Sequence, residues 1–551
     1  MLEYTFDAYV QEHIPDKMRK TKYGETFKGE KTMLKLRKII SLLLAVLLLT
    51  AVLCGCGDGK DATPTQPEAE SDSAAKEPTY GGTLTVGIAQ DLDDSLDPHT
   101  MAAAGTREVL FNVFEGLVKP DTDGNLIPAV ASEYVIGENA DTFTFTLREG
   151  VKFHDGREVT VGDVVYSLSR VAGFDTGTPL VSTFSAVESI EATDEKTIVV
   201  KTKEPYIEFL AFLNCAIIPE GCVPAEDGLI GTGPFKFVSR VAQEELVLEK
   251  NTEYWGEEAY LDKVVFKIIE NGDTLVMSLK SGAIDLCSHL TSTQIMGLEN
   301  DFNILEGSMN LVQALFLNNA YEPLQDIRVR QALNYAVDRQ MVLDFVADGK
   351  GFIVGSNMYP AFAKYYEDLT GMYTYDPQKA KDLLAEAGYA NGFDFTITVP
   401  SNYPFHVDTA QVVAEQLKAV GINCTIETVE WGTWYDEVYK GRNYEGTILG
   451  FDASGAMTAQ SLLARYESTH AKNMSNYVSE RYDEVYNAAL TATTEEEQIA
   501  LYKQAQTILA EDASNVYLQD PCDFVVLRKG IEGYVFYPIY VMDLAGVYFT
   551  K

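Results

Sequence analysis

The feature that most restricts the fold of this chain is a helix pattern followed directly by a strand pattern, as in residues 408–429. In DTAQVVAEQLKAVGINCTIETV, apolar residues recur at helical spacing up to Gly421. After that glycine, Ile422, Cys424 and Ile426 alternate with polar residues and share one face of a strand. Helix-then-strand units of this kind predict a layered α/β architecture.

Two further segments add local detail to this expectation. In TFTFTLREG, which begins at Thr142, the large apolar residues fall on one face at a period of two, which predicts a half-buried strand. In DPQKAKDLLAEAGY, Asp376 is the expected N-cap and Pro377 the first helical residue, and Gly388 ends the helix.

The length and charge of the chain restrict its class. The 551 residues are too many for a single core and suit two or three domains, and an apolar content of 46% is ample for burial. The net charge of −39 repels phosphate backbones and anionic lipid head groups, so we expect no nucleic-acid partner. Solubility outside the cell is one explanation of this charge, and a preference for cationic ligands is the other.

The N-terminal region resembles a lipoprotein signal. The apolar run 39–53 has 15 residues, fewer than the roughly 20 that span a bilayer, and basic residues at 35–38 precede it. The sequence LCGC at 53–56 resembles the bacterial lipobox. Cys56 follows a glycine and fits that motif, whereas Cys54 follows a leucine and does not. We predict lipidation at Cys56, the alternative being an uncleaved anchor.

These features divide the N-terminal region into three parts. Residues 1–32 have mixed charge unlike a signal sequence, which predicts a mis-called start with Met33 as the true first residue. Residues 33–55 are then the signal peptide. Residues 56–79 hold almost no bulky apolar side chain, which predicts a disordered tether with a mean reach of about 25 Å.

The cysteines give no complete disulfide framework. Once Cys54 is removed and Cys56 lipidated, an odd number remains. Two of these lie in strand-like apolar surroundings, which favours core positions, and a bridge between two others stays open. The remaining cysteines are Cys215, Cys222, Cys287, Cys424 and Cys522, of which Cys287 and Cys424 are the core candidates and Cys215 and Cys222 the possible pair.

Two short motifs resemble parts of enzyme active sites but lack the further residues that such sites require. The HDG tripeptide at 154–156 has no second histidine nearby to build a metal centre, so a tight Asp-Gly turn is expected. GTGPF at 231–235 is followed by Lys236 where a dinucleotide fingerprint needs its third glycine. No nucleophile elbow or Cys-His spacing is present. We expect no enzyme activity, no cofactor and no metal site.

Six segments of the chain, taken together and in order, point to one family. They resemble the extracytoplasmic solute-binding proteins of peptide-type ABC transporters, solute-binding family 5. The segments are LREGVKFHDGREVTVGDVVYSLSR at 147–170, GTGPFKFVSR at 231–240, LEKNTEYWGEEAYLDKVVFKII at 248–269, VRQALNYAVDRQMVLDFVADGKG at 329–351, KAKDLLAEAGY at 379–389 and EWGTWYDEVYKG at 430–441.

The resemblance implies a two-lobed, periplasmic-binding-protein-like α/β fold of type II, with a hinge between the lobes and an extra small domain. Ligand would lie between the lobes and stabilise their closed state, which a permease recognises. The protein is expected to be a monomer. The implied parts are lobe I at 80–120, 228–315 and 522–551, the extra domain at 121–227, and lobe II at 316–521.

The resemblance also suggests how a peptide amine is held. In peptide-binding relatives an acidic residue follows an aromatic one in a G-W-x-x-D type stretch. The matching stretch here is LGFDASG, with Phe451 at the aromatic position and Ser454 where the acid would be. Asp452 lies two residues earlier, either near the amine or only shaping a turn. Ile448 and Ala102 stand where such relatives tend to carry a basic residue and a glutamate.

Three other residues match cleft positions of the family, and a fourth is a further candidate. Trp431 matches an aromatic residue that packs on ligand, and a core tryptophan is the competing interpretation. Ser288 and His289 match polar positions that face the cleft, and His406 is a further candidate.

We therefore predict a receptor that is lipid-anchored at the extracytoplasmic face of the cell membrane. It would capture di- or oligopeptides and deliver them to the permease subunits of an ABC importer. The alternatives are another solute in the same fold (a glycan, an opine-like compound or a metal chelate) or a receptor for a peptide signal.

Overall fold

The computed structural model describes residues 77–551, except 94, 102, 225–227, 402 and 454–457. The described residues belong to one compact unit. In the described part, no helix combines the length and the apolar character that crossing a bilayer requires. The predicted lipidation site Cys56 lies outside the described residues. Strand β1, Pro78–Thr79, pairs with β21, so ordered structure begins before the predicted end of the tether at residue 79.

A mixed sheet of twelve strands forms the centre of the fold and confirms the α/β class. Strands β2, β11 and β12 run parallel to one another, as do β16, β17 and β18, and antiparallel pairs complete the sheet. Its strands are β2 Thr83–Ile88, β9 Phe235–Val241, β10 Glu245–Lys250, β11 Lys263–Ile268, β12 Leu286–Leu290, β13 Phe302–Ser308, β14 Val312–Leu317, β15 Gly351–Ile353, β16 Asp394–Pro400, β17 Asn423–Val429, β18 Gly446–Phe451 and β19 Asn515–Arg528.

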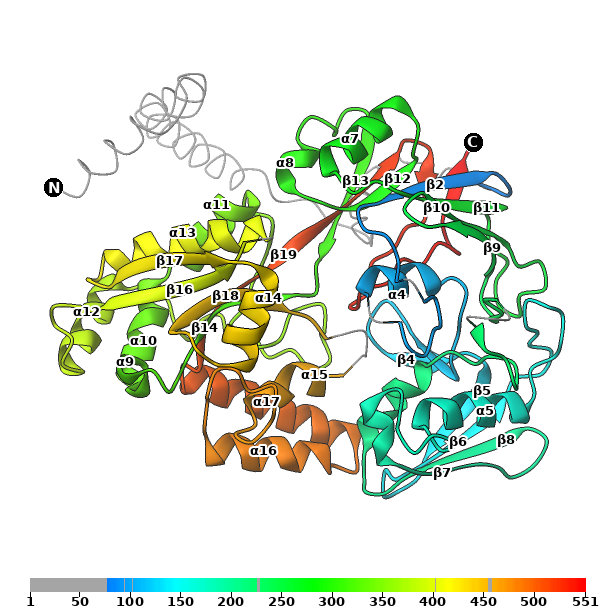
Figure 1. Ribbon diagram of the computed structural model, residues 1–551, viewed down its shortest axis with the longest axis horizontal. Helices are drawn as coiled ribbons and strands as arrows, with labels where there is room; N and C mark the ends of the chain where they lie inside the picture. The colour runs from blue at the N-terminus through cyan, green and yellow to red at the C-terminus, as the bar shows by residue number, and fades with distance from the viewer. Residues whose placement is uncertain (1–76, 94, 102, 225–227, 402, 454–457) are drawn as a thin grey trace, which may run out of the picture. The chain divides into compact units, whose positions relative to one another are not determined.

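The long strand β19 joins the two groups of strands. Its second half pairs with β12 and β13, and its first half pairs with β14 and β15. Figure 1 shows β19 running from the strands around β14 and β18 toward those around β12 and β2. The whole of β14 pairs with β18, so the chain crosses between the groups at about 309–311, a few residues before the predicted boundary at 315.

Asp520 accepts hydrogen bonds from residues at this crossing. Its Oδ1 accepts a hydrogen bond of 3.1 Å from the amide of Leu311, and the Ser308 hydroxyl donates to its other oxygen. The amide of Met309 donates to the carbonyl of Pro521 at 2.9 Å. Burial raises the pKa of Asp520 to about 7, against the lowering effect of these hydrogen bonds.

Helices cover the strands around β14, and two of them test the sequence predictions. Asp376 caps α12 by accepting from the amide of Lys379 at 2.9 Å, and Gly388 follows the helix with φ of 94°, as predicted. Helix α13 begins at Pro404, before the predicted segment. The helices here are α9 Glu322–Gln325, α10 Ile327–Ala336, α11 Arg339–Ala347, α12 Pro377–Glu386, α13 Pro404–Lys418, α14 Trp431–Thr433, the π-helix η3 Trp434–Lys440, α15 Gln460–Leu463, the 3-10 turn η4 Ala464–Tyr466, α16 Glu480–Leu490 and α17 Glu495–Glu511.

A separate antiparallel sheet of four strands lies within residues 121–227, the region predicted as the extra domain. Phe143 and Phe145 of β6 are fully buried against α5, which confirms the predicted half-buried strand. The elements of this region are β4 Leu126–Pro128, β5 Ala131–Ile136, β6 Thr142–Leu147, α5 Val161–Ala172, η1 Ser182–Ala186, β7 Val187–Ala192, β8 Thr197–Thr202 and η2 Ile207–Asn214.

Shorter elements complete the part of the chain around β2. They include a two-stranded pair, β3 with β4, and a three-stranded sheet in the order β1-β21-β20. Their bounds are α4 Ala104–Leu110, β3 Val118–Pro120, α7 Gly272–Ser281, α8 Ser292–Ile295, β20 Ile531–Glu532 and β21 Tyr548–Thr550.

The structure explains both motifs that suggested enzymes. Residues 154–156 form the expected turn, in which the amide of Gly156 donates to the carbonyl of Phe153 at 2.9 Å. His154 is half-buried, and its Nε2 lies 3.0 Å from the carbonyl oxygen of Gly233. A Cβ at Gly231 would lie 2.0 Å from the carbonyl oxygen of Val113, so the glycine of GTGPF allows close backbone packing.

Within the described region the cysteines form no disulfide, so the open question of a Cys215–Cys222 bridge is answered in the negative. Cys287 is fully buried, as predicted, whereas Cys424 is only half-buried at the sheet edge formed by β17.

Candidate ligand-binding site

A cavity of about 330 Å³ lies among α4, β3, η2 and the C-terminal residues 537–545. This volume falls within the range of pockets that hold small ligands. Its lining combines charged and apolar residues, among them Arg107, Glu115, Lys119, Phe111 and Asp543. The sequence analysis missed this lining, whose only local signal is the aromatic run YPIYVMD that follows the strand pattern near the C-terminus.

Glu115 is the buried charge at the wall of this cavity. Its carboxylate accepts from the Tyr254 hydroxyl and from Trp255 Nε1, each at 2.7 Å, and from the Thr232 hydroxyl at 3.2 Å. Lys119 Nζ lies 3.3 Å from the same carboxylate. With four donors around two oxygens, Glu115 frames the cavity and keeps little capacity to bind a ligand.

Two smaller cavities adjoin the same C-terminal segment, with volumes of about 20 Å³ and about 10 Å³. The first is bordered by His289, Glu108 and Asp523, and the second by Asp452 and Tyr359. Each has room for about one water molecule. The residues that border both are Met309, Asn310, Ile539 and Tyr540, and Ile539 also lines the large cavity.

The two small cavities place two predicted site residues near the same C-terminal segment. His289 comes from β12 and Asp452 follows β18, so they belong to the two groups of strands that β19 joins. Tyr540 borders both small cavities. Ser288, next to His289, is buried in β12. The predicted residue Ser454 and the departure at Ala102 lie outside the described residues.

His289 is held between two buried carboxylates. Its Nε2 lies 2.9 Å from Glu108 Oε1 and its Nδ1 lies 3.1 Å from Asp523 Oδ1. The ring stacks on Tyr540 with centroids 4.5 Å apart. Burial would lower the pKa of His289, but the two carboxylates outweigh it and raise that pKa well above its usual value. The histidine is therefore a cation with both nitrogens occupied, and it offers no free nitrogen to a ligand.

His406 also has a structural environment. It lies buried in α13, where its Nδ1 accepts from Gln313 Nε2 at 2.8 Å. Gln313 in turn accepts from Gln519 Nε2 at 2.8 Å and donates to the Thr409 hydroxyl at 3.1 Å. Burial lowers the pKa of His406 to about 4, so the ring is neutral at pH 7. His406 is thus part of a buried polar network.

Trp431 has the exposure expected of a contact surface. Its side chain is 41% exposed, and it stacks on Trp434 with centroids 5.2 Å apart. Trp434 is the core tryptophan, 1% exposed, and donates to the Thr447 hydroxyl at 3.0 Å. The exposed ring therefore lies on a rigid base, which is the geometry that a stacking platform requires.

Phe451 and Asp452 end β18 beside this aromatic group. Phe451 meets Phe316 edge to face with centroids 5.1 Å apart, and the Arg465 guanidinium carbon lies 3.7 Å from the centroid of the Phe451 ring. Asp452 is half-buried. Burial, with a contribution from the Asp452 charge, raises the pKa of Tyr359 well above its usual value.

The site therefore offers aromatic faces, fixed charges and a cavity, which are the means of binding. Among the described residues, no three His, Cys, Asp or Glu side chains gather in a way that could hold a metal ion. These candidate residues adjoin the crossing between the two groups of strands.

Comparison with known proteins identifies the class. Residues 125–473 match the family described as bacterial extracellular solute-binding proteins, family 5 Middle, and the chain belongs to this family. The solved structure of the ABC transporter substrate-binding protein CtaP from Listeria monocytogenes covers 86% of this chain and all of its own, with a TM-score of 0.78 and 23% identity. The predicted family and its two-lobed fold are thus confirmed.

Several named relatives extend over most of the chain. Heme-binding protein A of Haemophilus influenzae is 28% identical over 91% of this chain and 97% of its own length. The dipeptide-binding protein of Escherichia coli is 26% identical over 75% of this chain and 84% of its own length. The binding protein DppA of Helicobacter pylori, solved with the peptide STSA, is 27% identical, with a TM-score of 0.69 over 86% of this chain and 99% of its own. These relatives are binding proteins.

Proposed function

We propose that this protein captures di- or oligopeptides outside the cytoplasm and delivers them to an ABC importer, without chemical change to the ligand. The observation that carries this proposal is that Asp452 borders a small cavity at the crossing, with the exposed ring of Trp431 in the aromatic group beside the end of β18. Relatives named for dipeptides and oligopeptides, each aligned over most of this chain, support the ligand class.

In this proposal the crossing at β19 and residues 309–311 acts as the hinge. Ligand that contacts residues on both sides stabilises the closed arrangement by its difference in affinity for the closed and open forms. A permease that recognises only the closed form then receives only protein that carries ligand. In this proposal the binding protein acts as a monomer.

The Asp452 carboxylate would hold the ligand ammonium in a charge-assisted hydrogen bond. Such a bond contributes roughly 1.5 to 3 kcal/mol, so Asp452→Asn should weaken binding about tenfold to a hundredfold. Calorimetry with the co-purified ligand measures this, and Trp431→Ala is the companion variant. A change below about threefold at Asp452 with a clear loss at Trp431 would mean that stacking and shape hold the ligand, without an amine clamp.

Mass spectrometry of the molecule that co-purifies tests the ligand class directly. We expect an organic molecule with a free amine. Stoichiometric haem would favour the function for which the relative from H. influenzae is named, and would replace the peptide proposal.

We also propose that the mature protein is anchored by lipid at Cys56 on the extracytoplasmic face of the membrane. Cys56→Ser should leave the precursor uncleaved, whereas Cys54→Ser should be processed normally. Labelling of the Cys56→Ser protein with a radioactive fatty acid would contradict the assignment. A version that begins at Met33 should be processed like the longer one.

A further inference from the structure

The backbone joins the region of the four-stranded sheet to the group of strands around β2. The chain enters this region from α4 and β3 and leaves it toward β9. Helix η2, Ile207–Asn214, belongs to the region and lies far along the chain from the helices that cover β14. Any contact between η2 and those helices is therefore made by side chains and not by a connecting strand.

Two faces of η2 pack against different parts of the molecule. Phe209 is fully buried in the core of the four-stranded region. Ala211 is also buried, but it belongs to the hydrophobic core that contains Trp434 and Tyr502. Glu208 and Ala211 are three residues apart, and residues at that spacing share a face in a 3-10 helix. This face is directed toward α17.

Side-chain hydrogen bonds complete the contact on this face. The Glu208 carboxylate accepts from the Tyr502 hydroxyl at 2.6 Å and from the amide of Gln460 at 3.3 Å. The Tyr206 hydroxyl donates to Gln460 Oε1. Figure 1 shows α15 and α17 beside the four-stranded region. We call this the η2 contact, and its residues are Tyr206, Glu208 and Ala211 on one side and Gln460 and Tyr502 on the other.

The chemistry of the η2 contact suits a joint that can open. It joins hydrogen-bonding side chains and the small apolar residue Ala211, with Leu126 of β4 packed at its border. Lys364, whose charge acts on Glu208, forms its ion pair with Glu495 instead. Polar contacts between domains permit relative motion, whereas large hydrophobic ones hold domains in one arrangement.

Helix η2 also borders the large cavity. Phe212 and Asn214 line this cavity, as does Phe184, whose ring centroid lies 5.2 Å from that of Phe209. On the other side of the η2 contact, α15 follows β18 in the chain. A ligand in the cavity therefore touches the same short helix that makes the η2 contact.

We propose that the four-stranded region is a clasp, in which η2 closes on α15 and α17 when the two groups of strands close on a ligand. This inference rests on the proposed function, because it takes the crossing at β19 as the hinge. Strand β19 joins the two groups by its backbone, and the η2 contact joins them a second time by side chains. A contact that forms in the closed arrangement favours that arrangement, so it raises the affinity for ligand without touching it.

The first test needs no ligand. Ala211→Arg places a long charged side chain in the η2 contact and should increase the radius of gyration measured by small-angle X-ray scattering. The melting temperature should fall by less than about 3 °C, because each part keeps its own core. Ala192→Arg, at an exposed position of the same region, is the matched control and should change neither quantity.

Two results of this test would overturn the inference. A radius of gyration equal to that of wild type would show that the η2 contact does not hold the two groups of strands together. A much larger fall in melting temperature would identify the contact as a permanent part of the fold.

The second test measures the binding of a tripeptide library by mass spectrometry of the bound fraction. Tyr502→Phe should weaken binding about threefold to tenfold, because the closed form loses one buried hydrogen bond. Tyr482→Phe is the matched control, since its hydroxyl donates to the carbonyl of Leu463 at 2.7 Å on the same side of the contact. This control should bind as wild type does.

The outcomes of the second test separate the clasp from the proposed function. Equal affinities for wild type and Tyr502→Phe would contradict the clasp and leave peptide binding intact. If wild type binds no tripeptide, the proposed function fails, and the scattering of Ala211→Arg still decides whether the η2 contact is a clasp.

Discussion

Two cations beside different groups of strands differ in their burial and surroundings. His289, half-buried on β12, has a carboxylate at each ring nitrogen and an aromatic ring on its face. Arg465, buried beside β18, stacks on Phe451, and its Nε and Nη1 have no hydrogen bond. A charge whose partners are all supplied by the protein serves the fold, whereas a buried polar group without a partner costs stability.

The largest expected effect concerns the paired cation. His289→Leu leaves Glu108 and Asp523 as uncompensated buried charges, which should lower the free energy of unfolding by about 3 to 5 kcal/mol. Urea denaturation at pH 7 measures this difference. A triple variant that adds Glu108→Gln and Asp523→Asn should recover most of the loss. A single variant as stable as wild type would remove the structural role assigned to His289.

The next effect concerns Glu208, a buried acid that joins η2 to the helices around α17. It accepts from the Tyr502 hydroxyl at 2.6 Å and from the amide of Gln460 at 3.3 Å. Burial raises the pKa of Glu208 from 4.5 to about 7, although Tyr502, Gln460 and the charge of Lys364 each lower it.

The sign of the resulting pH dependence follows from proton binding. Between pH 4.5 and 7 the folded protein keeps a proton on Glu208 that the unfolded chain has released, so stability falls as the pH rises through this window. The fall should be on the order of 3 kcal/mol for this group. Glu208→Gln should remove that part of the slope in urea titrations, and Asp520 should still contribute in the same direction. An unchanged slope would mean that Glu208 is ionised in the fold.

A smaller effect is expected where an aromatic ring supports a buried cation. Phe451→Leu removes the ring beneath Arg465 and should cost about 1 kcal/mol of stability in the ligand-free protein, measured by urea denaturation. A variant as stable as wild type would show that the ring does not support the guanidinium.

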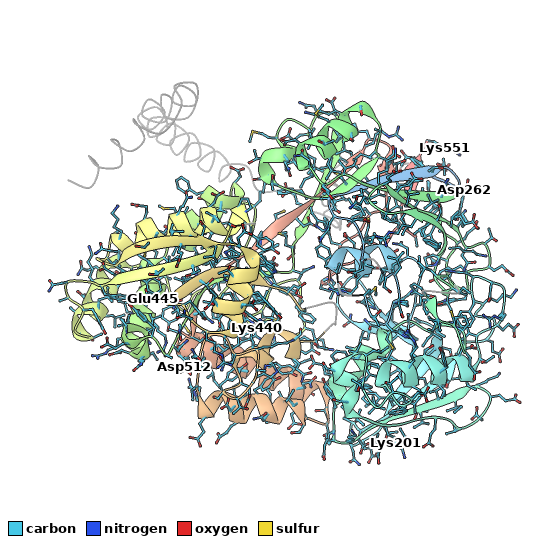
Figure 2. All side chains as sticks on the ribbon, viewed as in Figure 1. Lys201, Asp262, Lys440, Glu445, Asp512 and Lys551 are labelled. Atoms are coloured by element: carbon cyan, nitrogen blue, oxygen red, sulfur yellow. The ribbon has the colours of Figure 1, made fainter. Side chains whose placement is uncertain are left out.

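The smallest effect is expected at an exposed cation that also lies over an aromatic ring. Lys440, labelled in Figure 2, has its Nζ 4.3 Å from the Tyr435 ring centroid and 3.1 Å from Asp436. Because this group is exposed, Lys440→Ala should change stability by less than about 0.5 kcal/mol. A larger loss in thermal or urea unfolding would show that exposed contacts in this aromatic group matter as much as buried ones.

Part of the candidate site could be predicted from the sequence. The family resemblance gave Trp431 as a contact residue, and the structure shows an exposed ring on a rigid base. The sequence gives His406 only as a further candidate, and Gln313, with which it forms a hydrogen bond, comes from a strand 93 residues earlier. A matching position gives the residue type and approximate place, whereas the partner that fixes the role of a side chain comes from elsewhere in the chain.

The sequence by itself determined the α/β class, the family, and local features such as the Asp376 cap and the buried face of β6. The local features depend on residues within one helical turn or one strand, so the sequence pattern is sufficient to predict them. Only the tertiary structure decided that His289 lies between two carboxylates and that Arg465 stacks on Phe451. The carboxylates of His289 are 181 and 234 residues away in sequence, and folding alone determines whether a buried charge meets its partner.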